Sequence, residues 1–150
     1  MKNKMILIAH RGNINGKIPE RENSPEYILE AIELGYHVEV DVWYQDNQIF
    51  LGHDNPEYEI DISFLKNDKI WCHCKNVEAL EELIKNDIHC FFHKSEDVIL
   101  TSKGYMWIFP RKKLLKNSVC VLPEVAQYKK EDIQQCTGIC SDYVENYKDF

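Results

Sequence analysis

The sequence predicts an α/β fold, a reduced barrel of the TIM-barrel-like (βα)8 type in which several helices are short or missing. Three observations predict it. About seven or eight short apolar segments have strand character, and amphipathic segments with helical spacing separate the early ones. The chain has 150 residues, enough for one domain that spans residues 1–150. Ordinary eightfold barrels take about 200 residues or more, so several helices must be missing here.

The clearest unit is a strand–helix–strand segment in the first third of the chain. Residues 5–9 are apolar and predict the first strand. Residues 24–26, Ser-Pro-Glu, predict a helix start with a serine cap and proline at the first position, and Gly35 predicts its end. Residues 36–43 predict the second strand. Such a unit places the helix over one face of a parallel sheet.

The remaining elements have weaker signals. Residues 49–51 predict a short returning strand, and Asn76 predicts the cap of a second helix at residues 77–84. The helices become shorter toward the C-terminus. The other predicted elements are strands at 70–75, 88–93, 105–109, 119–122 and 138–142, and a short helix at 129–136.

Charge and composition exclude several classes of partner. The formal net charge is −7, and this field discourages binding of nucleic acid. A small phosphate ester still fits such a chain where a metal ion reverses the local sign of the potential. The apolar start of the chain is too short for an export signal or a transmembrane segment, so a cytoplasmic location is expected.

Six cysteines invite a zinc interpretation, which we weigh against a structural one. Cys72 and Cys74 lie inside an apolar strand, and alternation sends both side chains to the same face. A zinc site of the usual kind needs two pairs of ligands in Gly-rich turns. Burial as small, reduced core residues is therefore the favoured interpretation.

Glu39 and Asp41 lie on the second predicted strand, where period-two alternation puts both carboxylates on one face. Two like charges about 6–7 Å apart along a strand repel each other and lose hydration, which favours a cation between them. The pair is therefore interpreted as half of a divalent metal site. The alternative is an edge strand whose acidic residues face water.

Other strand ends carry chemistry of a matching type. The first strand ends in His10 and Arg11, the returning strand leads to His53, and the third strand carries His73 and Lys75 on one face. In a parallel barrel all C-terminal strand ends open on one mouth, so these side chains are expected to converge there.

These motifs resemble those of the glycerophosphodiester phosphodiesterase family. The resemblance covers the first third of the chain well and has a weaker match near its end. It implies a metal-dependent phosphoric diester hydrolase in which Glu39 and Asp41 bind the metal and His10 and His53 act as acid and base. The matching segments are Ile8-Ala9-His10-Arg11-Gly12, Glu22-Asn23-Ser24 with Ala31 and Gly35, Glu39-x-Asp41, Gly52-His53-Asp54 and, more weakly, Gly138-Ile139-Cys140-Ser141-Asp142.

The resemblance implies further roles in the same mouth. Arg11 would clamp the phosphate, and Glu22 would be a secondary metal ligand or a partner that orients Arg11. The family usually has a Glu-x-Lys pair on the third strand, where this chain has His73-Cys74-Lys75. Either His73 is a ligand in an altered site, or the site has decayed. With fewer carboxylates the expected ion is Mg²⁺, with Ca²⁺ or Mn²⁺ as alternatives.

The expected function is metal-dependent hydrolysis of a small glycerophosphodiester-like substrate, or of a phosphate-linked lipid or glycan head group, which would place the chain in lipid metabolism. Lys75 would neutralise charge in the transition state, and His93 and Trp107 would line the substrate pocket. The alternative is a barrel that binds a phosphate-containing ligand without turnover. Attack by water or by a neighbouring hydroxyl, and homodimer formation, both stay open.

Overall fold

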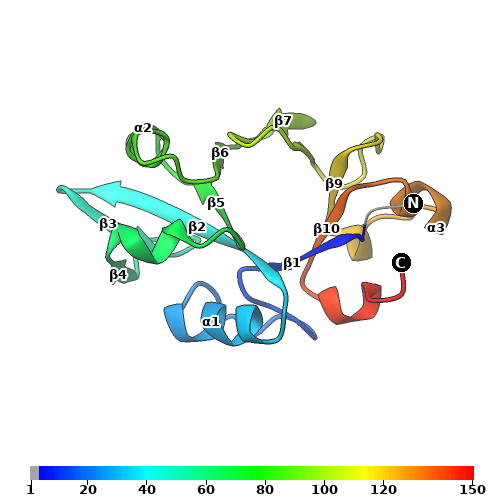
Figure 1. Cartoon of the computed structure of the whole chain (residues 1–150), viewed down its shortest axis with the longest axis horizontal. Helices are drawn as coiled ribbons and strands as arrows, with labels where there is room; N and C mark the ends of the chain where they lie inside the picture. Colours follow the sequence, from blue (N-terminus) through cyan, green and yellow to red (C-terminus); the bar gives the residue numbers. More distant parts are fainter. Residues whose placement is uncertain (1–3) are drawn as a thin grey trace.

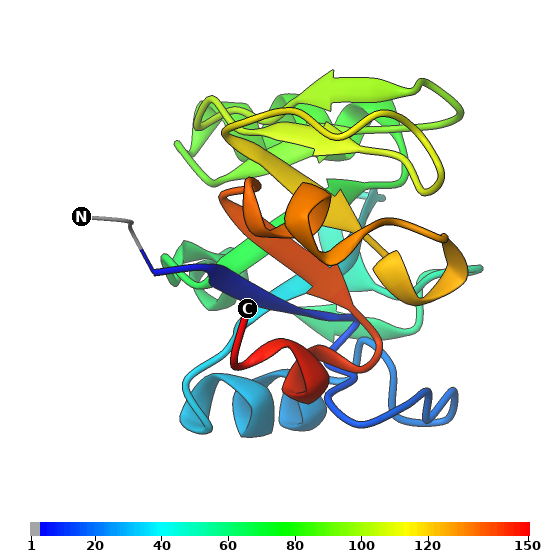
Figure 2. The ribbon, with the colours of Figure 1, turned by 90° about the vertical axis from the view of Figure 1, so that its right-hand side faces the viewer.

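The computed structural model describes residues 4–150, in which ten strands form one curled sheet (Figure 1). The strands are β1 (Ile6–His10), β2 (His37–Gln45), β3 (Gln48–Leu51), β4 (Tyr58–Ile60), β5 (Ile70–Cys74), β6 (Cys90–Phe92), β7 (Val98–Leu100), β8 (Met106–Ile108), β9 (Ser118–Val121) and β10 (Gly138–Ser141). Seven of them pair in parallel, in the order β6-β5-β2-β1-β10-β9-β8. Figure 2 shows β1, β10 and β9 side by side.

Three short α-helices accompany the sheet. They are α1 (Pro25–Glu33), α2 (Val77–Lys85) and α3 (Lys130–Gln134). Three 3₁₀ helices, η1 (Ile62–Lys66), η2 (Pro123–Val125) and η3 (Val144–Tyr147), complete the connections. None of the helices among residues 4–150 is long and apolar enough to cross a membrane.

The predicted α/β barrel of the (βα)8, TIM-barrel type is wrong. Over the described residues the chain is mostly β, and its sheet mixes parallel and antiparallel pairs. The β2–β3–β4 meander and the β7–β8 hairpin occupy stretches where a barrel of this type would place helices. No ladder joins β6 to β8 within residues 4–150, so the sheet stays a curled half-barrel.

Local sequence explains why the first helices form where they do. The Ser24 hydroxyl accepts a hydrogen bond from the Tyr27 backbone N–H at 3.3 Å, and Pro25 supplies the first turn of α1. The Asn76 side chain caps α2 in the same way, through the backbone N–H of Ala79 at 3.0 Å. Both caps lie where the sequence predicts them.

The side chains on the two faces of β2 have different surroundings. Val38, Val40 and Val42 are fully buried in the core cluster that also contains residues of α1 and α2. Glu39 and Asp41 point to the opposite face, the inside of the curl. There a second apolar cluster, which includes Ile8, Trp71, Phe91, Trp107, Val119 and Cys140, fills the interior.

Parallel pairing brings the carboxyl ends of distant strands to one edge of the sheet. In the register of the sheet, His10 on β1 lies beside Glu39 on β2. On the other side of β2, Asp41 lies beside His73 on β5. The site is therefore assembled by strand pairing on both sides of β2.

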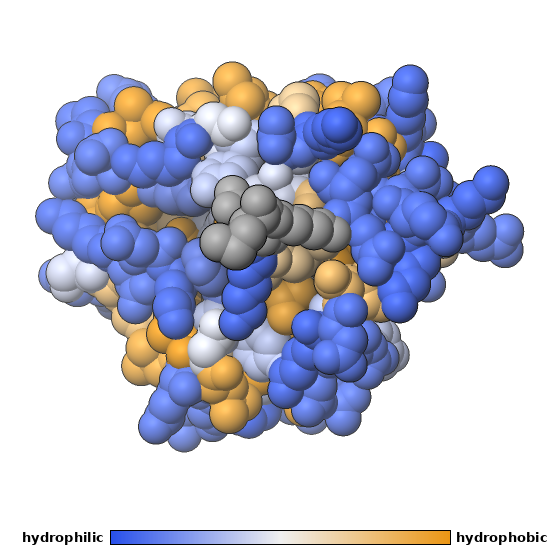
Figure 3. All heavy atoms as spheres, turned by 45° about the vertical axis from the view of Figure 1, so that its right-hand side comes forward, coloured by the Kyte–Doolittle hydropathy of each residue, from blue (hydrophilic) through white to orange (hydrophobic). Residues whose placement is uncertain are grey.

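The cysteines are all free and buried. The metal-ligating cluster found among residues 4–150 contains no cysteine. This arrangement agrees with their interpretation as small core residues. On the face shown in Figure 3, hydrophobic residues lie in separate patches among hydrophilic ones.

The loop that carries His53 requires a glycine at position 52. The φ of Gly52 is +153°, and a Cβ at this position would overlap the backbone carbonyl oxygen of Asn55. We expect Gly52→Ala to lower the free energy of unfolding by about 2 kcal/mol or more, measured by chemical denaturation. Gly35→Ala is the matched control, because Gly35 has φ +96° and no heavy atom within 4 Å of its added Cβ. Equal losses for the two variants would contradict this account.

Candidate functional site

A cavity of about 160 Å³ opens at the carboxyl ends of the parallel strands. One part of its wall is polar and the other is apolar. Eight of the ten residues predicted for the site line it. The lining residues are His10, Arg11, Glu39, Asp41, His53, His73, His93, Trp107, Phe109, Pro110, Val121 and Leu122.

Two predicted residues lie elsewhere. Lys75 follows the last residue of β5 and is not part of the cavity lining; its backbone N–H donates to the Val42 carbonyl at 2.8 Å. Glu22 accepts hydrogen bonds from Arg11 Nη1 at 3.1 Å and from Asn13 Nδ2 at 2.8 Å. Both Glu22 oxygens are thus engaged, which matches the role of orienting Arg11 rather than that of a metal ligand.

Glu39, Asp41 and His73 form a compact cluster of possible metal ligands. One donor atom from each lies within 4.8 Å of the others. His73 Nδ1 is 3.2 Å from Asp41 Oδ1 and 3.7 Å from Glu39 Oε2. Glu39 and Asp41 are only 2% and 1% exposed, and β2 lies between β1 and β5. The alternative of an edge strand with water-facing carboxylates therefore does not hold.

The surroundings of Glu39 fit a cation in this cluster. Among residues 4–150 its side chain accepts one hydrogen bond, from the Arg11 backbone N–H at 3.3 Å. The nearest His10 nitrogen is 3.8 Å away. A buried carboxylate usually accepts several hydrogen bonds or binds a metal. The donor set of two carboxylates and one imidazole suits a divalent cation.

Asp41 is held more firmly than Glu39. Asn23 donates from Nδ2 to Asp41 Oδ2 at 2.9 Å and accepts from the Asp41 backbone N–H at 2.8 Å. Burial alone would raise the pKa of Asp41, but hydrogen bonds from His53 and His73 and the nearby Arg11 charge hold it well below its usual range. Asp41 is thus a fixed, ionised group.

Asp142, for which the sequence predicted no role, fixes the ring of His10. His10 Nδ1 is 2.7 Å from Asp142 Oδ1, at the end of β10 beside β1. Burial lowers the pKa of His10, but the Asp142 hydrogen bond and the charges of Glu39 and Asp142 outweigh it, so the pKa is raised. The signal for Asp142 was its place at the end of the last predicted strand, residues 138–142.

His53 and Arg11 fix each other. Arg11 Nη2 is 3.1 Å from His53 Nε2, and His53 Nδ1 is 3.3 Å from Asp41 Oδ2. A guanidinium donates hydrogen bonds and accepts none, so Nε2 is the acceptor and Nδ1 carries the proton. This tautomer leaves a lone pair on the nitrogen that faces Arg11.

Asn13 is a second residue that sequence reasoning missed. It is fully buried, and its Nδ2 donates to Glu22 and to Asp142 Oδ1, the latter at 2.9 Å. Its Oδ1 accepts from the Tyr27 hydroxyl at 3.0 Å. Asn13 therefore connects the partner of Arg11 to the partner of His10. A single Asn in a loop carries no sequence signal for such a role.

His73 and His93 are linked through the backbone. His73 Nε2 is 3.0 Å from the His93 carbonyl oxygen, and the two rings meet edge to face. Burial lowers the pKa of His73, but the nearby carboxylates of Asp41 and Glu39 outweigh this effect and raise the pKa to about 9. His93 stacks on Phe109, and its buried Nε2 makes no hydrogen bond within residues 4–150.

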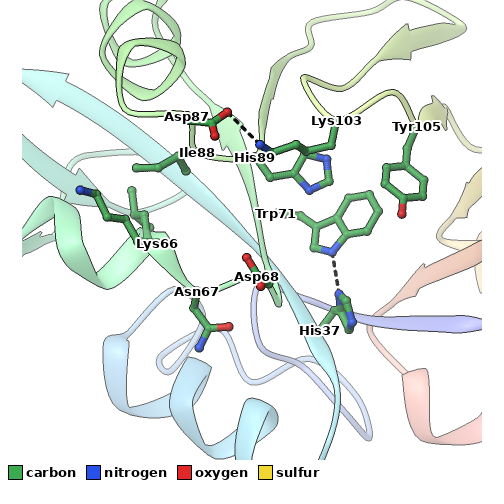
Figure 4. Close-up of a pocket in the computed structure, with 11 residues that line it drawn as sticks. His37, Lys66, Asn67, Asp68, Trp71, Asp87, Ile88, His89, Lys103 and Tyr105 are labelled. Carbon is green, nitrogen blue, oxygen red and sulfur yellow. Dashed lines mark hydrogen bonds and ion pairs between the residues drawn. The ribbon is translucent and has the colours of Figure 1, made fainter.

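A larger cavity of about 310 Å³ lies at the opposite, amino-terminal end of the strands (Figure 4). Trp71 Nε1 donates to His37 Nδ1 at 3.0 Å, and His89 Nε2 lies 2.8 Å from the Thr101 hydroxyl. Its two acidic side chains, Asp68 and Asp87, are exposed, and Asp87 pairs with Lys103. This cavity lacks the buried charges that distinguish the first one.

Comparison of the chain with protein-family models, with curated proteins and with solved structures found no match. The geometry of the cavity therefore carries the functional argument.

His89 in the second cavity predicts an acid-sensitive step in stability. Burial, with the charges of Lys103 and His37, lowers the pKa of His89 to about 4. His89 thus contributes stability above its unfolded pKa of about 6.5 that is lost as the pH falls from 6.5 to 4. We expect His89→Gln to reduce this loss by about 1–2 kcal/mol, since the ring is partly exposed.

The measurement is urea denaturation of both proteins at several pH values. Glutamine retains an amide that can bond Thr101, so the variant changes the titration more than the packing. Parallel stability curves for wild type and variant below pH 6.5 would contradict the assignment.

Proposed function

We propose that this chain is a phosphoric diester hydrolase that acts on a small glycerophosphodiester-like substrate with the help of a divalent cation. One observation carries the proposal. Two imidazoles, each fixed by a carboxylate, line the same small cavity as a buried pair of carboxylates and an arginine. Phosphodiester hydrolysis needs these groups together: an acid, a base and positive charge at the phosphate.

His53 is the base in this proposal. Its Nε2 accepts from Arg11 Nη2 and so carries a lone pair. An arriving phosphate offers Arg11 a charged acceptor, which is stronger than a neutral imidazole. Arg11 Nη2 then donates to the phosphate while Nη1 stays on Glu22. His53 Nε2 takes the proton of the attacking group, which is water or a neighbouring hydroxyl of the substrate.

His10 is the acid. Asp142 holds Nδ1, and the carboxylate favours the imidazolium form of the ring. Nε2 therefore faces Glu39 and the cavity. As the bond between phosphorus and the leaving oxygen breaks, His10 donates its proton to that oxygen and an alcohol departs.

Charge neutralisation comes from Arg11 and from a cation held by Glu39, Asp41 and His73. Such a cation, when bound, offsets charge on a non-bridging phosphate oxygen. Glu22 keeps Arg11 Nη1 in place during the reaction. Because Lys75 does not line the cavity, we assign it no role at the phosphate.

The resemblance of the motifs to glycerophosphodiester phosphodiesterases supports the same reaction. The residues that carry it, among them His10, Arg11, Glu39, Asp41 and His53, line one cavity. The apolar wall formed by Trp107, Phe109, Val121 and Leu122 offers room for the less polar part of a substrate.

The test is release of alcohol from glycerophosphodiesters by the purified chain with added divalent cation. We expect His10→Gln and His53→Gln each to lower kcat by about 10²–10⁴-fold, because each removes one proton-transfer group. EDTA should lower the wild-type rate as well. His89→Gln in the remote cavity is the matched control and should retain the wild-type rate.

Two outcomes would overturn the proposal. One is a wild-type rate in both variants at the candidate site. The other is tight binding of a phosphodiester by the wild-type chain with no product, which would favour the alternative of a binding module.

A further inference from the structure

We infer that the cluster of Glu39, Asp41 and His73 selects a first-row transition-metal ion over Mg²⁺ and Ca²⁺, with His73 Nδ1 as a direct ligand. The inference concerns the cation of the proposed function and rests on it for the choice of site. It starts from the imidazole that lies beside the two carboxylates in the cluster.

The orientation of His73 is set before any ion arrives. Its Nε2 is 3.0 Å from the His93 carbonyl oxygen, which only accepts hydrogen bonds. When a cation takes the place of the Nδ1 proton, the ring keeps its other proton on Nε2 and Nδ1 becomes the ligand. Histidine ligands usually have such a partner on the nitrogen that does not bind the metal. Stacking on Phe91, with ring centroids 5.2 Å apart, fixes the plane of the ring.

Nδ1 of His73 is directed at the carboxylates. Strand pairing places His73 beside Asp41, and Nδ1 is 3.2 Å from Asp41 Oδ1 and 3.7 Å from Glu39 Oε2. Three different donor atoms thus surround one small volume at the wall of the open cavity. Water or a phosphate oxygen would supply the remaining ligands of an ion there.

The low negative charge of the site disfavours Ca²⁺ and Mg²⁺. Only two carboxylates are in the cluster, and Arg11 Nε lies 3.5 Å from Asp41 Oδ2. Affinity for Ca²⁺ and Mg²⁺ depends on the number of charged oxygen ligands and is therefore reduced. Imidazole nitrogen adds little for these hard ions, whereas transition-metal ions bind it well.

Mn²⁺ is the probe for the experiment, because its electron spin resonance reports both binding and ligand type. The metal-free wild-type chain is titrated with Mn²⁺, and Mg²⁺ or Ca²⁺ is added in competition. We expect Mn²⁺ to bind about 10-fold or more tightly than either competitor. Spin-echo modulation of the bound Mn²⁺ should show a directly bonded nitrogen.

Two variants identify that nitrogen. His73→Glu should remove the nitrogen signal and tighten Mg²⁺ and Ca²⁺ binding, so that the preference for Mn²⁺ shrinks by about 10-fold. His89→Gln should leave both the signal and the preference unchanged. A wild-type protein without the nitrogen signal, or a signal that persists in His73→Glu, would overturn the inference.

The outcome is separable from that of the proposed function, since these measurements need no substrate. Nitrogen-ligated Mn²⁺ in a chain that hydrolyses no phosphodiester would sustain this inference and remove the proposed function. Metal-dependent hydrolysis without nitrogen ligation would do the reverse.

Discussion

The structure depends on the burial of two like charges on one strand of the sheet, β2. Glu39 and Asp41 project from the same face of β2, which has a parallel neighbour on each side. Such a pair is unfavourable in an apolar interior unless positive charge and hydrogen-bond donors are brought to it. His10, Arg11 and His73 supply positive charge. His53 Nδ1 and the Asn23 amide donate hydrogen bonds to Asp41.

The loops at the carboxyl edge of the sheet bring hydrogen-bond donors and positive charge to these two carboxylates. Arg11 has φ +56° directly after β1, which brings its backbone N–H to Glu39 while its guanidinium reaches Asp41, Glu22 and His53. Asn23 also has positive φ, at +67°, and makes two hydrogen bonds with Asp41. Backbone conformations of this kind cost free energy, which the hydrogen bonds and ion pairs at the carboxylates offset.

Much of the candidate site followed from the sequence, because two simple rules apply to it. Alternation along β2 correctly paired Glu39 with Asp41, and parallel strands brought His10 and His73 to the same edge. Alternation failed for Lys75, because β5 ends one residue earlier, at Cys74, and Lys75 does not line the cavity. Asp142 and Asn13 were missed since their roles depend on contacts between segments about 130 residues apart.

The fold was less predictable than the site. The first strand–helix–strand unit has strong caps and was predicted correctly, whereas the barrel was not. Short strands such as β7 and β8 pair in antiparallel fashion through a tight turn at Gly104, and a strand pattern alone does not distinguish this from a parallel crossover.

The most direct test of the central constraint is the thermal unfolding of the metal-free chain with and without added Mn²⁺. If the buried carboxylates require a cation, Mn²⁺ should raise the Tm of the wild-type chain by several degrees, and Glu39→Gln should abolish most of this rise. An identical Tm with and without the ion, in wild type and variant alike, would contradict the account.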